Sequence, residues 1–443
     1  MLECAQQWII KVPASSANIG PGFDVLGLGL SLYLTLDVHK RPASAGSKGE
    51  IKLSYHGEGA SEAPLDPYKN LITRVALYVL LSHRVSFPHD ADVSIEITNE
   101  IPFGRGLGSS AAAVVAGVHL ASALGDLKLS QDRMKDYALM VERHPDNITA
   151  ALVGGFTGSF LRMLDPSELA PSSIPLAEVL PAYPPNAGPP QPGDPLPPQP
   201  PRGVGKHVSY PLAPGIGVVV VVPRFEVETA KARGALPDKY ERADVVRTVP
   251  RRPRFLHDDQ RKLTLSPRTG VQPSAPRGLN HLARADATGR ERDLGVDARP
   301  RTPAVARSSG QWHIHPRGRT RSHQHALLLQ IPGLSQIVNH MTPVTHPGLL
   351  GICLSGAGPT ILALVATGES SDEMSGGSGG VISTDTSEIT LGSSSSGSAG
   401  PATPRMREIG EAIKAFWKEQ GNIDVDWLAL KVDQVGATCT EQP

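Results

Sequence analysis

Hydrophobic and polar residues alternate along two stretches of the chain, residues 28–38 and 93–97. A period of two places every second side chain on the same face, so both stretches predict half-buried β-strands. A shorter apolar stretch, residues 9–12, predicts a strand that enters a loop at Pro13. Residues 217–222 are almost continuously apolar, which is typical of a strand buried on both faces.

Two further stretches have the composition and spacing of helices. Residues 109–124 are rich in alanine and valine and predict a helix that is buried over much of its surface. Residues 130–143 predict a second helix, which begins at the N-cap residue Ser130 and cannot continue through Pro145. Strands with hairpin-like alternation come first and helices follow, so the pattern favours an α+β fold over a doubly wound parallel sheet.

The length of 443 residues predicts two or three domains, because one hydrophobic core rarely grows past about 250–300 residues. We expect an N-terminal domain over residues 1–180, a proline-rich linker or loop over 181–206, and a C-terminal domain over 207–443. The C-terminal domain ends with a predicted helix at 405–420 and a predicted strand at 427–432.

Two segments of the C-terminal half have unusual compositions. Residues 369–404 are rich in glycine and serine and predict a disordered insertion. Residues 247–325 hold 16 arginines, one lysine, six acidic residues and eight prolines, without an apolar period. We interpret this basic segment as disordered or as translated in the wrong reading frame. Two other interpretations stay open: a basic arm that binds nucleic acid, and a metal site formed by His313, His315, His323 and His325.

The overall charge changes this picture little. The chain has 43 basic and 43 acidic residues, which argues against a nucleic-acid-binding or membrane-surface role for the whole protein. Its cysteines, Cys4, Cys353 and Cys439, match no metal-binding spacing and predict no disulfide framework. The N-terminus has no basic stretch followed by an apolar one, so we expect no signal peptide and a cytoplasmic protein.

Three glycine-rich segments carry the candidate chemistry, and the strongest is residues 102–112, PFGRGLGSSAA. Its glycines allow backbone N–H groups to turn inward at the positive end of the following helix, where Ser109 and Ser110 add hydroxyl donors. The spacing is neither a dinucleotide fingerprint nor a Walker loop. An anion-binding loop is favoured, although a glycine-rich turn that caps a helix has the same local pattern.

The other two segments are ambiguous when each is taken alone. Residues 11–24 place Asn18 and Asp24 on a loop between two predicted strands, where they are either ligands of a polar substrate or ordinary turn residues. Residues 354–360, LSGAGPT, follow an apolar run. Such a loop either approaches a ligand closely or forms a plain turn.

Together and in this order, the three segments resemble the GHMP family of small-molecule kinases. The stretches VPASSANIGPGFDVLGLGL, VERHPDNITAALVGGF and HPGLLGICLSGAGPTILAL are similar to the homoserine kinase branch of that family, in its fungal version. The resemblance covers residues 1–246 and 331–443, apart from the low-complexity insertions. It implies a two-domain α+β fold of the GHMP type.

The resemblance also implies a site for ATP and magnesium. Ser110, or its neighbour Ser109, and Glu142 would hold Mg²⁺ through the hard oxygen ligands that this ion prefers. The residues implied in binding ATP are Pro102, Gly104, Arg105, Gly106, Leu107, Gly108, Ser109, Ser110, Ala111, Ala112, Gly356 and Gly358.

A further set of residues matches the family's positions that face homoserine. Asp24 and Thr229 are the candidates for positioning the reacting hydroxyl, and Arg233 would pair with the substrate carboxylate in bidentate geometry. Leu327 occupies a place where the family has a second arginine for that carboxylate. The matching substrate positions are Asn18, Asp24, His144, Asp146, Thr229 and Arg233, with Asn147 in the same H-P-D-N turn.

The activity that this resemblance implies is ATP-dependent phosphorylation of the side-chain hydroxyl of L-homoserine, a step of threonine biosynthesis. The partners would be small molecules only, with no nucleic acid and no membrane, and a homodimer is left open. Two alternatives are kept: a catalytically impaired GHMP scaffold that acts as a binding protein, and another GHMP kinase of the mevalonate or galactose type.

Overall fold

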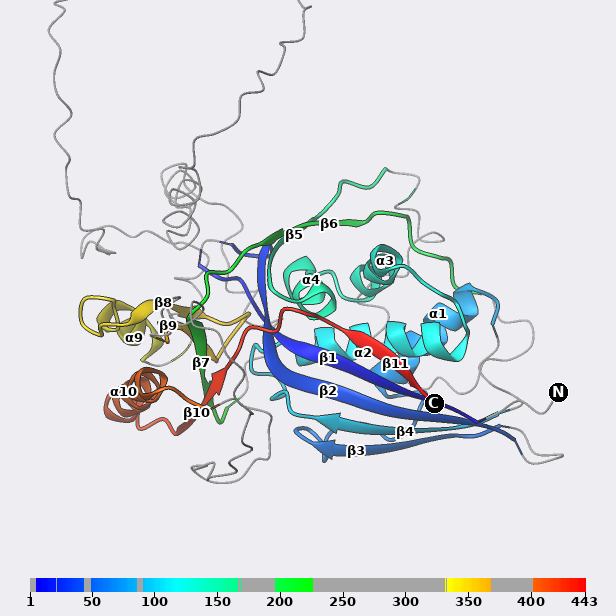
Figure 1. Cartoon of the computed structure of the whole chain (residues 1–443), viewed down its shortest axis with the longest axis horizontal. Helices are drawn as coiled ribbons and strands as arrows, with labels where there is room; N and C mark the ends of the chain where they lie inside the picture. The colour runs from blue at the N-terminus through cyan, green and yellow to red at the C-terminus, as the bar shows by residue number, and fades with distance from the viewer. Residues whose placement is uncertain are drawn as a thin grey trace, which may run out of the picture. The chain divides into compact units, whose positions relative to one another are not determined.

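The structure of the protein is a computed structural model. All residues that it describes belong to one compact unit, which contains two β-sheets and the helices packed on them (Figure 1). The described residues are 5–20, 22–43, 49–85, 91–165, 168, 196–225, 331, 333–367 and 401–443. The basic segment 247–325 and residues 369–400 of the predicted insertion 369–404 therefore lie outside the described residues. The last residue of that insertion, Pro404, begins a helix, so the predicted end of the insertion is too far along the chain.

The first sheet has seven strands, and both ends of the chain contribute to it. Its main order is β11-β1-β2-β4-β3, and β5 pairs with both β2 and β6. Neighbouring strands are antiparallel except β3 and β4, which are parallel. The strands are β1 (Gln6–Ala17), β2 (Leu26–Pro42), β3 (Ile51–Gly57), β4 (Ala91–Asn99), β5 (Phe156–Leu161), β6 (Gly205–Tyr210) and β11 (Thr438–Gln442).

The alternating stretches 28–38 and 93–97 are confirmed as parts of β2 and β4. The predicted end of the first strand at Pro13 is wrong, because β1 continues to Ala17. The register between β1 and β2 shifts between Pro13 and Ala14. A β-bulge at this point accommodates a residue that has no N–H to donate. The strand therefore continues past the proline to Ala17.

Four helices accompany the first sheet: α1 (Leu71–Ser82), α2 (Ser109–Leu124), α3 (Gln131–Val141) and α4 (Pro145–Val153). Helices α2 and α4 pack on β1 and β2, and α2 also contacts α1 and α3 (Figure 1). The predicted helices are confirmed, and Ser130 caps α3 by accepting a hydrogen bond from the Arg133 N–H at 3.3 Å. Pro145 starts α4, where its fixed φ suits the first helical position.

The second sheet has four antiparallel strands in the order β10-β7-β9-β8. Its elements are β7 (Ile216–Pro223), α9 (Leu334–His340), β8 (Leu349–Leu354), β9 (Ile361–Ala366), α10 (Pro404–Gly421) and β10 (Val425–Leu430). The structure confirms the strand predicted at 217–222, the helix predicted at 405–420 and, two residues early, the strand predicted at 427–432.

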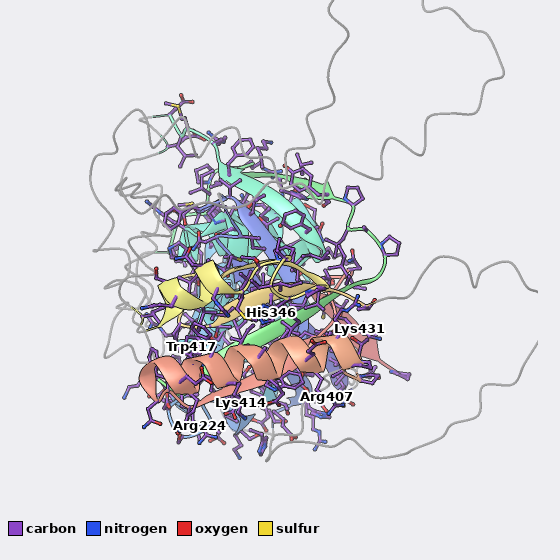
Figure 2. All side chains as sticks on the ribbon, turned by 90° about the vertical axis from the view of Figure 1, so that its left-hand side faces the viewer. Arg224, His346, Arg407, Lys414, Trp417 and Lys431 are labelled. Atoms are coloured by element: carbon purple, nitrogen blue, oxygen red, sulfur yellow. The ribbon has the colours of Figure 1, made fainter. Side chains whose placement is uncertain are left out.

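Helix α10 lies across this second sheet (Figure 2). Its buried residues recur every three or four positions, so a single face of the helix meets the sheet. The largest of them, Trp417, is fully buried. Thr403 caps the helix by accepting a hydrogen bond from the Met406 N–H at 3.3 Å. The residues of the buried face are Met406, Ile409, Ile413 and Trp417.

The two sheets do not follow the order of the chain. Strands β6 and β11 both pair within the first sheet, although β6 begins only at the end of the proline-rich segment 181–206 and β11 lies near the end of the chain. The proposed boundaries of 1–180, 181–206 and 207–443 stay predictions. Two cysteines fall among the described residues, the buried Cys353 and the exposed Cys439, and both are free thiols. No helix in the described part of the chain is long and apolar enough to cross a membrane.

Candidate active site

The three glycine-rich segments, which are far apart in sequence, meet at one place. The end of β1 contacts the phosphate loop, residues 102–112, through the Ser15 N–H, which donates to the carbonyl oxygen of Leu107 at 3.1 Å. The loop between β8 and β9 contacts it through the Ser355 hydroxyl, which donates to the carbonyl oxygen of Gly106 at 2.6 Å. The phosphate loop is therefore held from two sides by hydrogen bonds to its own backbone.

Two buried hydroxyl groups strengthen this junction. Ser16 and Ser355 are fully buried, and their Oγ atoms are 2.8 Å apart. Next to them, the Gly356 N–H donates to the Ala17 carbonyl at 2.9 Å. A buried hydroxyl needs a partner, and here each of the two serines finds one on a different segment. The sequence reasoning missed Ser16 and Ser355 as functional residues, since nothing local marks a serine that bonds across the fold.

The backbone of the phosphate loop requires glycine at its alternate positions. Gly104, Gly106 and Gly108 have φ values of 61°, 79° and 71°, in the left-handed region. A Cβ atom on Gly106 would overlap the carbonyl oxygen of Ser355, and one on Gly108 would overlap the Ser15 Oγ atom. Glycine is therefore required for both conformation and space, and it allows the loop to turn directly into the N-terminus of α2.

The other predicted loop residues differ in what they can offer. Leu107, Ala111 and Ala112 are fully buried, so any contact with a ligand must come from their backbone. Pro102 has no N–H to donate. The Arg105 side chain donates to two backbone carbonyls, those of Pro223 through Nε at 3.1 Å and Phe103 through Nη1 at 3.0 Å.

The late loop is built from residues 355–360, between β8 and β9. A Cβ atom on Gly356 would lie 3.1 Å from the carbonyl oxygen of Gly106. The Gly358 N–H donates to the Ser355 carbonyl at 2.9 Å and closes the turn. Both glycines therefore lie in a turn that packs on the phosphate loop.

A hydroxyl and a carboxylate meet where α2 begins and α3 ends. Ser110, in the first turn of α2, donates from Oγ to Oε2 of Glu142 at 2.7 Å. Glu142 is the C-cap residue of α3, and its Oε1 lies 3.1 Å from Nδ1 of His144. Hydroxyl and carboxylate oxygens are ligands that Mg²⁺ accepts, so this donor set fits the predicted metal site.

The loop between β1 and β2 brings two carboxylates close together. Asp146, at the start of α4, is 1% exposed and accepts hydrogen bonds from the backbone N–H groups of Asn18 at 3.3 Å and Asn147 at 2.9 Å. Asn18 in turn accepts a bond from the Asp24 N–H at 2.8 Å. Asn18 and Asp24 have φ values of 60° and 56°, which asparagine and aspartate tolerate better than most residues.

This arrangement changes the acidity of the buried carboxyl. Burial, and then the negative charge of Asp24, raise the pKa of Asp146 to about 7, although hydrogen bonds from Asn147 and Asn18 and the charge of His144 act in the opposite direction. A cation bound beside these two carboxylates would favour the charged form of Asp146. The site therefore suits a ligand with a positively charged group.

A further contact joins the end of β1 to the H-P-D-N turn. The Ser15 hydroxyl donates to Oδ1 of Asn147 at 3.0 Å, so the H-P-D-N turn is tied to the strand that supports the phosphate loop. The predicted residues Asn18, Asp24, Glu142, His144, Asp146 and Asn147 are thus brought together with the loop. Thr229, Arg233 and Leu327 lie outside the described residues, and the roles given to all of these residues stay predictions.

Comparison with known proteins places the chain in a family. Residues 70–155 match the family described as "GHMP kinases N terminal domain". The homoserine kinase of Saccharomyces cerevisiae is 46% identical over 362 residues, which is 80% of this chain and 87% of that protein. The homoserine kinase of Schizosaccharomyces pombe is 40% identical over 367 residues, 82% of this chain and 89% of that protein.

The crystal structure of homoserine kinase from Cytophaga hutchinsonii is similar in fold, with a TM-score of 0.57 at 20% identity over 99% of this chain and 98% of that one. These matches agree with the convergence of the three glycine-rich segments on one phosphate loop. The chain belongs to the homoserine kinase family of GHMP kinases.

Proposed function

We propose that the protein transfers the γ-phosphoryl group of ATP to the side-chain hydroxyl of L-homoserine and forms O-phospho-L-homoserine for threonine biosynthesis. The observation that carries this proposal is the contact between the phosphate loop and the turn with Glu142, His144 and Asp146. Ser15 bonds both, through its N–H to Leu107 and its hydroxyl to Asn147. A nucleotide site and a site for the ammonium group of a small substrate are therefore adjacent.

The phosphates of ATP would bind at the N-terminus of α2. The free backbone N–H groups of a first helical turn and the positive end of the helix dipole favour an anion there. The left-handed glycines let the loop backbone approach the phosphates without side-chain interference. The loop need not change its conformation to do this, because hydrogen bonds from Ser15 and Ser355 to its backbone carbonyls already fix it.

Magnesium would be held by Ser110 and Glu142, whose oxygens are already in contact. When bound, the ion would neutralise charge on the phosphate oxygens and help to align them. His144 bonds the second oxygen of Glu142 and so restricts the orientation of that carboxylate.

Homoserine would bind beside the pair formed by Asp24 and Asp146. Its ammonium group would stabilise the ionised form of Asp146, which burial and the charge of Asp24 otherwise disfavour. Its hydroxyl would be oriented by Asp24 or by Thr229. Arg233 would take its carboxylate. Because phosphoryl transfer has a loose transition state, alignment and charge neutralisation contribute more than a strong base. The cytoplasmic location and the homodimer stay predictions.

The test is ADP release by the full chain with ATP, Mg²⁺ and each of L-homoserine, mevalonate and galactose. We expect homoserine to be the preferred substrate. Glu142→Gln should lower the rate by about 100-fold or more and raise the Mg²⁺ requirement, because it removes a charged ligand. Glu96→Gln, at an exposed position on β4, is the matched control.

Two results would contradict the proposal. A preference for mevalonate or galactose would assign the chain to another GHMP reaction. No ADP release with any substrate, together with salt-sensitive binding of RNA, would favour the non-catalytic scaffold. Peptide mass spectrometry over residues 240–335 should accompany the assay, so that the polypeptide tested is known to contain or to lack the basic segment.

A further inference from the structure

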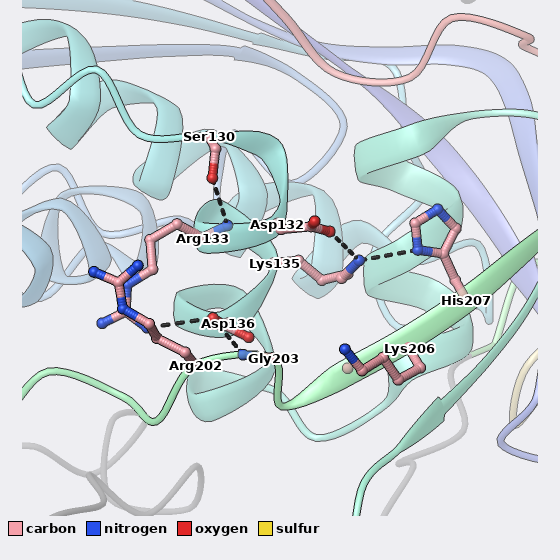
Figure 3. A pocket seen from close by; sticks show the side chains of 10 residues that line it. Ser130, Asp132, Arg133, Lys135, Asp136, Arg202, Gly203, Lys206 and His207 are labelled. Carbon is pink, nitrogen blue, oxygen red and sulfur yellow. Dashed lines mark hydrogen bonds and ion pairs between the residues drawn. The ribbon is translucent and has the colours of Figure 1, made fainter.

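A pocket lies outside the site described above, between the first turns of α3 and residues 202–207, the last three of which begin β6 (Figure 3). Its volume is about 410 Å³. None of the residues that line it belongs to the phosphate loop or to the H-P-D-N turn. Basic side chains outnumber acidic ones among the residues that line it.

One of its two carboxylates is fully occupied by groups of the protein. Asp136 is 2% exposed and accepts hydrogen bonds from the backbone N–H groups of Gly203 at 2.9 Å and Val204 at 2.8 Å. It also accepts one from Arg133 Nη1 at 3.2 Å. This carboxylate fastens the segment before β6 to α3 and balances the charge of Arg133.

The other carboxylate balances a buried lysine. Lys135 is 3% exposed, and its Nζ lies 2.8 Å from Asp132 Oδ1 and 2.9 Å from His207 Nδ1 (Figure 3). Burial, and then the charge of Lys135, lower the pKa of His207, which favours the neutral ring that can accept a bond from the ammonium group. An ammonium group has three N–H donors, and these partners use two of them.

Two more cations remain on the pocket wall. Arg202 and Lys206 line it, and among the described residues neither side chain forms an ion pair. The Lys206 ammonium folds back over Gly203, where a Cβ atom would lie 3.3 Å from its Nζ. After the pairs of Arg133 with Asp136 and of Lys135 with Asp132, the pocket keeps two positive charges.

We propose that this pocket binds a small phosphate dianion, either inorganic phosphate or a phosphate monoester of a few carbon atoms. Such a group carries about −1.5 to −2 charge at pH 7 and offers three strong acceptor oxygens. Arg202 supplies a planar fork for two of its oxygens, Lys206 a mobile point charge, and Lys135 a directed donor at the pocket wall. A carboxylate would leave half of the charge uncompensated.

The two sources of the ligand can be separated by experiment. Labelled inorganic phosphate and labelled O-phospho-L-homoserine are each added to the full chain in equilibrium dialysis, with the phosphate loop occupied by Mg²⁺ and a non-hydrolysable ATP analogue. We expect saturable binding that weakens with ionic strength. Arg202→Ala with Lys206→Ala should weaken it at least about tenfold, the contribution of one charge-assisted hydrogen bond.

Both substituted side chains are exposed, so the double variant should fold, which its melting temperature verifies. Lys52→Ala on β3, another exposed lysine, is the control and should bind like the wild type. Tighter binding of the monoester would identify it as the ligand, and equal or tighter binding of phosphate would identify a free-phosphate site. No saturable binding, or equal binding by the double variant, would overturn the proposal.

Discussion

Asp146 is the residue whose chemistry depends most on its surroundings. It is almost fully buried, it accepts two backbone hydrogen bonds, and the negative charge of Asp24 acts on it. Burial and that charge outweigh the hydrogen bonds and raise its pKa to about 7 from 3.8. The folded protein therefore binds a proton at Asp146 more tightly than the unfolded chain does.

The pH dependence of stability and of substrate binding should consequently have opposite signs. The stability contribution of Asp146 is fully present below its unfolded pKa of 3.8 and is lost as the pH rises through about 7. Binding of the homoserine ammonium needs the ionised form, so its affinity should rise over the same range near pH 7. Melting curves and KM for homoserine between pH 6 and 8 measure the two effects.

Asp146→Asn provides the comparison for this prediction. The variant cannot ionise, so the part of the pH dependence that belongs to Asp146 should disappear from both measurements, and KM for homoserine should rise at least about tenfold. Asp37→Asn, on β2 and partly exposed, is the matched control. Equal pH slopes for wild type and Asp146→Asn would show that another group titrates.

At the scale of elements, the phosphate loop depends on space that only glycine leaves. Gly106→Ala would place a methyl group against the Ser355 carbonyl and would also force alanine to a φ of 79°. The left-handed conformation alone costs about 1–2 kcal/mol, so the loop should shift and KM for ATP should rise at least about tenfold.

Gly351→Ala is the control for this change, because a Cβ atom there meets nothing within 4 Å. Its melting temperature and KM for ATP should stay near those of the wild type. If the two variants bind ATP equally well, the close packing of the late loop on Gly106 does not support nucleotide binding.

Helix α2 carries a buried histidine that the proposed reaction does not use. His119 is 7% exposed, its Nε2 atom has no hydrogen-bond partner among the residues that the structure describes, and burial lowers its pKa to about 4. The unfolded chain binds a proton at this position near pH 6.5 and the folded protein does not. Its contribution therefore makes the protein less stable as the pH falls from about 6.5 to 4.

His119→Leu should remove this loss, because leucine has a similar size and no titratable group. We expect the melting temperature of the variant to fall less than that of the wild type between pH 7 and pH 5. His56→Leu, at an exposed position on β3, is the control and should follow the wild type. Parallel curves for His119→Leu and the wild type would contradict the prediction.

At the scale of the whole molecule, the end of the chain supports the site through β1. Strand β11 pairs with Gln7 to Lys11 on the side of β1 away from β2. Removal of residues 437–443 would leave these backbone groups without their partners. At about 1 kcal/mol for each hydrogen bond, the loss is roughly 2–5 kcal/mol of a typical total of about 5–15 kcal/mol.

We therefore expect the chain that ends at Gly436 to have a clearly lower melting temperature and weaker ATP binding, because β1 also carries Ser15 and Ser16. The chain that lacks only Pro443 keeps all of β11 and is the control. An unchanged melting temperature after the longer truncation would mean that β11 contributes nothing to the stability of the first sheet.

Local patterns predicted much of the fold. The period of two over 28–38, the helix at 109–124 and the cap at Ser130 depend on interactions within a few residues, and the structure has all three. The continuation of β1 through Pro13 was missed, since the bulge that accommodates the proline exists only because β2 lies beside it. Partners that are distant in sequence decide such a feature.

The same division holds for the candidate site. The sequence by itself determined the glycine spacing of the phosphate loop and the family to which it belongs, because those follow from local backbone requirements and residue identity. Only the tertiary structure decided that Ser16 meets Ser355, 339 positions away, and that Asp146 is buried beside Asp24. Burial and hydrogen-bond partners arise when distant segments pack, and they set the pKa of Asp146 and the rigidity of the loop.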